Sequence, residues 1–198
     1  MATTTAEKPK AATTERAAPS GTALAAGAAA AGLALGLAAN LFRKAVVQAP
    51  TALAGNWADA LAAEHKATLA IFDKIQETGE AQTSKRAFLL MQLKHALAKH
   101  AMEEENAIYA ALRDNGQVAE ADHLNEDHGY VKQYLYDLTM LPKDSPSWSR
   151  KVGEFRSRIE AHMKEEEEVI FPRLRAALDE DGNKQLTVAM NKEGLKIA

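Results

Sequence analysis

One short pattern occurs twice in the chain, and it limits the fold more than any other feature. His100 is followed four residues later by Glu104, and His162 is followed four residues later by Glu166. Residues four apart on an α-helix lie one turn apart on the same face. Each pair therefore predicts a helix that presents an imidazole and a carboxylate side by side.

The sequence around the two pairs repeats as well. Each pair lies in a run of glutamates, and a further histidine stands upstream of each, His65 before the first pair and His128 before the second. His128 follows His65 by 63 residues, and His162 follows His100 by 62. The repeat indicates two copies of one helical hairpin whose His and Glu side chains meet at one centre.

The pattern of apolar residues after Ala49-Pro50-Thr51 predicts long helices joined by short turns such as Asp114-Asn115-Gly116. No stretch alternates as a strand would, so we expect an all-α fold. Over residues 56–178 we expect an antiparallel up-down-up-down four-helix bundle, with Pro172 kinking its last helix. The predicted helices span residues 56–78, 83–113, 118–140 and 147–178.

The segments outside the bundle are predicted from composition. Residues 1–21 are expected to be a disordered tail, and residues 22–48 an additional Ala/Gly-rich apolar helix. Residues 22–42 carry no charge, so this helix either packs on the domain or on a second copy, or anchors the chain to a membrane. Residues 179–198 are expected to be a C-terminal tail with a short helix near 184–191. We expect a cytoplasmic protein and leave membrane association open.

Composition restricts the chemistry. The chain contains no Cys, which excludes disulfides, thiolate metal sites and thiol catalysis. Any metal must be bound by His, Asp and Glu, and a mixed set of nitrogen and oxygen donors suits iron, manganese or zinc. The formal net charge of -3 favours no nucleic-acid partner.

The repeated motif resembles the hemerythrin-like, or HHE cation-binding, domain family over about residues 56–178. That resemblance implies a centre of two non-heme iron ions, although manganese would use the same donors. It also implies that Glu104 and Glu166 bridge the ions, and that dioxygen, peroxide or nitric oxide binds at an open position. The six matching residues are His65, His100, Glu104, His128, His162 and Glu166.

The chain departs from the oxygen-carrying members of that family, which have one more His and an Asp in place of the last Glu. The only other histidine near His128 is His123, and residues five apart on a helix differ by about 140° in direction. We therefore expect a more open site, suited to redox turnover or sensing. Glu103 and Glu165 are interpreted as groups that orient the imidazoles, and Tyr109 as a packing residue.

Three functions remain open at this stage. The first is a di-iron protein that binds, reduces or senses a small oxygen- or nitrogen-oxide ligand. The second is an iron-buffering protein without turnover. The third is a structural interaction module in which the His and Glu residues bind nothing.

Overall fold

The computed structural model describes Met1 and residues 55–197, and every described element is a helix. The predicted tail at 1–21, the predicted helix at 22–48 and the proposed membrane contact of residues 22–42 lie outside the described residues. None of the described helices is long and apolar enough to cross a membrane. The helices are α2 (Trp57–Gln76), α3 (Thr83–Glu103), η1 (Glu104–Ile108), α4 (Tyr109–Asp114), α5 (Val118–Met140), α6 (Pro146–Glu165), η2 (Glu166–Ile170), α7 (Phe171–Ala177) and α8 (Glu180–Ile197).

The helices begin and end where local chemistry favours it. The side chain of Asn56 accepts a hydrogen bond from the amide of Asp59 and caps α2. Ser145 caps α6 in the same way, with Pro146 in the first turn. Gly116 has a φ of +78° between α4 and α5, a conformation that side chains with a Cβ rarely adopt.

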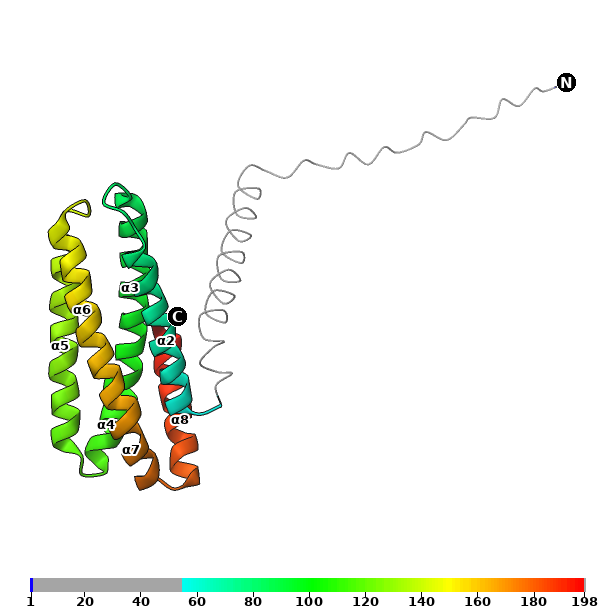
Figure 1. Ribbon diagram of the computed structural model, residues 1–198. Helices are drawn as coiled ribbons and strands as arrows, with labels where there is room; N and C mark the ends of the chain where they lie inside the picture. Colours follow the sequence, from blue (N-terminus) through cyan, green and yellow to red (C-terminus); the bar gives the residue numbers. More distant parts are fainter. Residues whose placement is uncertain (2–54, 198) are drawn as a thin grey trace. The chain divides into compact units, whose positions relative to one another are not determined.

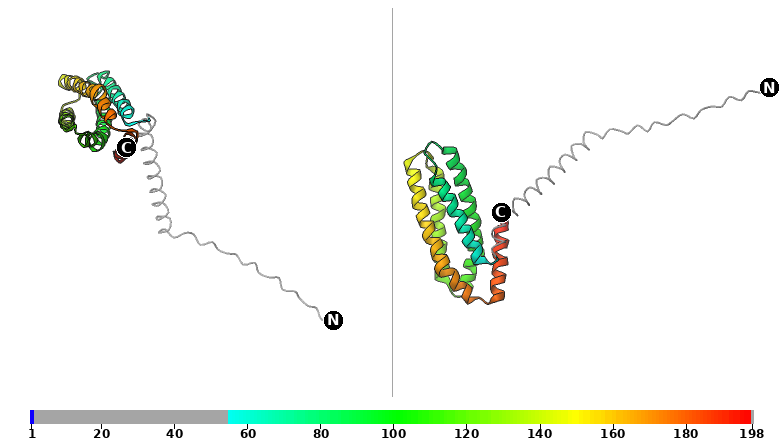
Figure 2. Two further views of the ribbon diagram at one scale, coloured as in Figure 1. Left: turned by 90° about the horizontal axis from the view of Figure 1, so that it is seen from below. Right: turned by 45° about the vertical axis from the view of Figure 1, so that its right-hand side comes forward.

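The four long helical stretches pack side by side in a closed ring. α2 contacts α3 and α6, while α5 contacts α6 and α3. Figure 1 shows that successive stretches run in opposite directions, with the turns after α2 and α5 at one end and those after α4 and α7 at the other. Seen along the axis in Figure 2, the helices enclose a common centre.

The C-terminal segment forms a full helix instead of the short one expected near 184–191. α8 packs along α3, η1 and α2, burying Leu186 and Met190 at a four-residue spacing. The side chain of Asn183 accepts a hydrogen bond from the Trp57 indole at 2.9 Å, and Thr187 accepts one from the Trp57 amide at 3.1 Å. These contacts tie the end of the chain to the start of α2.

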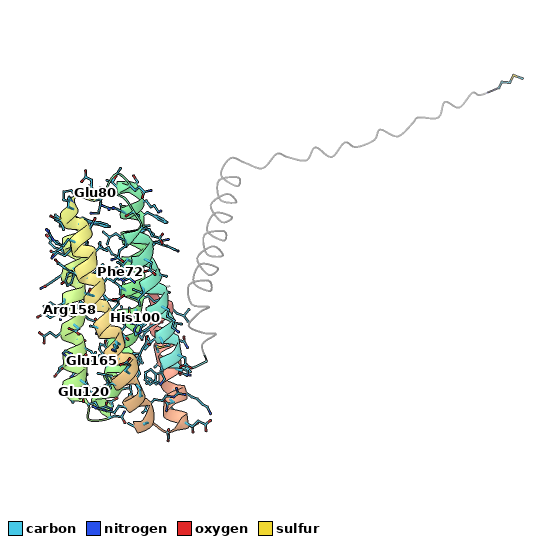
Figure 3. All side chains as sticks on the ribbon, in the orientation of Figure 1. Phe72, Glu80, His100, Glu120, Arg158 and Glu165 are labelled. Carbon is cyan, nitrogen blue, oxygen red and sulfur yellow. The ribbon has the colours of Figure 1, made fainter. Side chains whose placement is uncertain are left out.

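Two apolar clusters fill the interior, one toward each end of the ring. One contains Trp57, Tyr109 and Phe171, and the other contains Phe72 and Phe155. Along each long helix the predicted His and Glu residues fall between these clusters. The fold therefore holds a buried polar layer between two apolar ones, and Figure 3 places His100 midway along the helices with Phe72 nearer the end that carries Glu80.

Candidate metal centre

Four imidazoles, one from each long helix, converge in the polar layer. His65 comes from α2, His100 from α3, His128 from α5 and His162 from α6. Each is 4% exposed or less. The Nε2 atoms of His65 and His100 lie only 2.9 Å apart. The fold thus brings together all four histidines that the repeat singled out.

The two predicted carboxylates lie between imidazoles of different hairpins. Glu104 Oε2 is 3.1 Å from His100 Nε2 and 3.3 Å from His128 Nε2. The equivalent oxygen of Glu166 is 3.5 and 3.4 Å from the Nε2 atoms of the other two imidazoles. Both glutamates are fully buried. Each carboxylate therefore spans the two halves of the repeat.

Among the described residues, two of the three groups of neighbouring donor atoms share Glu104. One comprises His65, His100, Glu104 and Glu166, and the other comprises Glu104, His128 and His162, with ligand atoms within 4.8 Å of one another in each group. Metal–nitrogen and metal–oxygen bonds of about 2.0–2.2 Å place neighbouring donors roughly 2.8–3.6 Å apart in octahedral or tetrahedral geometry. Most of the separations between donors across the cluster fall close to that interval.

Several buried polar atoms of this cluster make no hydrogen bond within the described part of the chain. They include Glu104 Oε1, Glu166 Oε2 and His162 Nε2. A buried polar atom without a partner costs about 1–3 kcal/mol, and more when it is charged. A metal ion at this position would satisfy these lone pairs, so the residues present fit a metal centre.

A carboxylate faces the other ring nitrogen, Nδ1, of each imidazole. For His65, His100 and His128 this contact is a hydrogen bond, which fixes the N–H on Nδ1 and leaves the Nε2 lone pair facing the centre. The Nδ1 of His162 makes no hydrogen bond within the described part of the chain. The pairs are Glu167 with His65 at 2.7 Å, Glu64 with His100 at 3.1 Å, Glu105 with His128 at 3.0 Å and Asp127 with His162 at 3.5 Å.

The expectation for Glu165 was wrong, because its carboxylate pairs with His123. Glu103 lies in a further group of neighbouring donor atoms, with Glu64 and His100. Glu103 accepts from Lys99 Nζ at 2.8 Å, and burial beside Glu64 raises its pKa to about 8. Glu165 lies 3.3 Å from the exposed His123, which points away from the centre as predicted. The repeat held the missed signal, since Glu64 and Asp127 immediately precede the upstream histidines.

Tyr109 packs in an apolar cluster as expected, and its hydroxyl also reaches the His and Glu cluster. It donates to Glu166 Oε1 at 3.0 Å, and it lies 3.3 Å from Glu104 Oε2 and 3.1 Å from His128 Nε2. The cause is the π turn of η1, in which the Tyr109 amide donates to the carbonyl of Glu104, five residues earlier. This turn brings Tyr109 nearer to the face of Glu104 than a regular α-helix would, since residues five apart on an α-helix differ by about 140° in direction. The same π turn precedes Phe171, and Pro172 lies in the first turn of α7 that follows.

In the metal-free protein, protons on His100 and His128 balance the negative charge of the buried carboxylate of Glu104. Burial lowers the pKa of His128, but hydrogen bonds to Glu104 and Glu105 outweigh it and raise that pKa to about 9. The pKa of His100 is also raised well above its usual value, because Glu104 and Glu64 outweigh its burial. Burial raises the pKa of Glu104, but its interactions with His100 and His128 outweigh burial and hold that pKa well below its usual range. Bound cations would take the place of these protons.

A cavity of about 140 Å³ opens onto this layer. Three of the four imidazoles line it, and its other walls are mainly apolar side chains of α3, α5 and α6, while His65 does not contribute. Lys94 and Lys132 also line the cavity. The lining residues include Leu97, Val131, Leu135, Ile159 and Met163, together with His100, His128 and His162.

Comparison with known proteins agrees with this geometry. A family model described as "Hemerythrin HHE cation binding domain" matches residues 58–174. A DNA nickase of Nostoc sp. (strain PCC 7120 / SAG 25.82 / UTEX 2576) is 21% identical over 142 residues, which is 72% of this chain and 40% of that protein. The chain thus spans about two fifths of the length of this relative. No solved structure matches the present chain.

Proposed function

Because the chain belongs to the hemerythrin HHE cation binding domain family, we propose that residues 56–178 are an antiparallel four-helix bundle with a centre of two non-heme iron ions. The ligands are His65, His100, Glu104, His128, His162 and Glu166. The protein binds, reduces or senses a small ligand such as dioxygen, peroxide or nitric oxide. The observation that carries the proposal is Glu104, which belongs to two buried donor groups at once.

The protein supplies a buried set of donors. Two bound iron ions would supply the electrons and the open coordination positions for the small ligand, and manganese would use the same donors. The carboxylates on Nδ1 hold His65, His100 and His128 in one tautomer and one orientation. Burial of Glu104 and Glu166 strengthens their interaction with cations, because water is excluded from the layer.

The cavity favours small ligands over organic substrates. Its volume of about 140 Å³ suits a diatomic molecule or peroxide, and His128 and His162 lie at its inner wall. A larger substrate would require the surrounding helices to separate. The nickase activity in the name of the Nostoc relative belongs to a protein of which this chain covers 40%, and the net charge of -3 gives no reason to add a nucleic-acid partner.

The test begins with the purified full-length chain, stripped of metal and reloaded anaerobically with iron(II). We expect two iron ions per chain and, after exposure to air, the near-ultraviolet absorption of an oxidised di-iron pair. A chain that takes up no iron would refute the proposal and leave a structural module. Consumption of dioxygen, peroxide or nitric oxide by the loaded protein then separates a reactive or sensing centre from an iron buffer without turnover.

A further inference from the structure

The two halves of the centre are not equivalent, and one position accounts for the difference. Tyr109 in the first hairpin and Phe171 in the second occupy matching places, each directly after a π turn that begins at a glutamate of the cluster. The Tyr109 ring packs beside His128 with ring centres 5.3 Å apart, and Phe171 stacks on His65 at 6.2 Å. Only the first position carries an oxygen.

That oxygen lies at distances typical of two donors bound to the same ion. It is 3.1 Å from His128 Nε2, 3.3 Å from Glu104 Oε2 and 3.0 Å from Glu166 Oε1. Neighbouring ligands at bond lengths of about 2.0–2.2 Å stand roughly 2.8–3.6 Å apart. The Tyr109 side chain is 1% exposed, so bulk water does not compete for its oxygen.

Tyr109 also approaches the centre from the side opposite the cavity. It belongs to the apolar cluster that contains Trp57 and Phe171. Cavity residues such as Ile159 and Met163 belong to the other cluster. A donor at Tyr109 would therefore leave the cavity side of the His128 and His162 position free for a small ligand.

On the basis of the proposed function, we propose that the Tyr109 phenolate oxygen is a seventh ligand, bound to the ion held by His128 and His162. As the metal–oxygen bond forms, the phenol proton is released along its hydrogen bond to Glu166 Oε1 and passes from there to solvent. The ion beside Phe171 has no such ligand, so the two positions differ in affinity and in spectrum. The difference arises from one aromatic residue in an otherwise repeated pair of hairpins.

The test uses resonance Raman spectroscopy of the full chain, loaded with iron(II) and oxidised in air. A phenolate bound to iron(III) gives a visible charge-transfer band and enhanced ring vibrations, which shift when the protein is made with ring-deuterated tyrosine. We expect these vibrations in the wild-type protein. An oxidised sample with two irons per chain and no such vibrations overturns the inference while leaving the proposed function intact.

Variants assign the signal to one residue. Tyr109→Phe should abolish the phenolate vibrations and weaken binding of one of the two irons at least about tenfold, with the other unchanged. Tyr136→Phe, at an exposed position, should change neither. Phe171→Tyr in the Tyr109→Phe background should restore a phenolate signal from the other half. Vibrations that persist in folded Tyr109→Phe, checked by circular dichroism, would disprove the assignment.

If no iron binds to the wild-type chain, the proposed function fails and the role of Tyr109 fails with it. If iron binds and the protein reacts with its small ligand but shows no phenolate signal, only the role of Tyr109 fails. The two failures are distinguished by the metal content of the same sample.

Discussion

Removing the metal should lower the thermal stability of the protein by a large and measurable amount. The centre buries two carboxylates and four imidazoles in one layer, and all six side chains are 4% exposed or less. A ligand at 100 times its Kd stabilises the folded state by about 2.7 kcal/mol per site, so two sites add about 5 kcal/mol. For a folded part of about 140 residues, 1 kcal/mol shifts the Tm by roughly 3–4 °C. We therefore expect loading to raise the Tm by roughly 15–20 °C.

The assay is differential scanning calorimetry of chelator-treated protein with and without manganese(II), which avoids oxidation during the scan. Magnesium serves as the control ion, because it prefers oxygen donors and binds imidazole poorly. The His100→Ala/His162→Ala double variant should show no shift with manganese. Equal Tm values for loaded and chelated wild-type protein, within about 2 °C, would refute the reasoning that the cluster is built around metal.

Three further predictions distinguish residues that bind metal from residues that stabilise the fold. The His100→Ala/His162→Ala variant should lose both iron and near-ultraviolet absorption, whereas His95→Ala, at an exposed position, should keep both; full iron content in the double variant by elemental analysis would show that the site is misassigned. The metal-free protein should lose about 3 kcal/mol of unfolding free energy between pH 6.5 and pH 9, because the pKa of His128 rises to about 9 on folding. The stabilisation by protonated His128 is complete below pH 6.5 and is lost as the pH passes 9. Urea unfolding at the two pH values checks this, and greater stability at pH 9 would contradict it. Arg86→Met should cost about 2–4 kcal/mol without changing iron content, because this buried guanidinium donates to Thr78 and Lys143 near the far turn; metal analysis beside urea unfolding tests it, with Lys85→Met as the exposed control.

The sequence predicted the helices well because their signals are local. Apolar spacing and turn residues placed the four long helical stretches within two residues of their bounds, and the repeat singled out six residues that the fold brings together. The predicted C-terminal helix was shorter than α8 because the apolar face of α8, with Leu186 and Met190, is short. This face is buried only by contact with α3 and α2, which the local sequence does not reveal. The orienting carboxylates were missed because their imidazole partners lie on other helices. Glu105, for example, holds His128 of the second hairpin.

The π turns explain why regular helical spacing could not predict the inner residues of the centre. In both hairpins two consecutive glutamates contact imidazoles, Glu104 with Glu105 in one and Glu166 with Glu167 in the other. Consecutive residues of an α-helix point about 100° apart, which would send the second carboxylate away from the centre. A π turn has more residues per turn and so a smaller angle between neighbours, and it begins at the first glutamate in both copies. The widened turn lets one glutamate face the metal position while the next reaches across to an imidazole of the other hairpin. Since the same turn also carries Tyr109 over Glu104, one departure from α-helical geometry sets three of the contacts that define the centre.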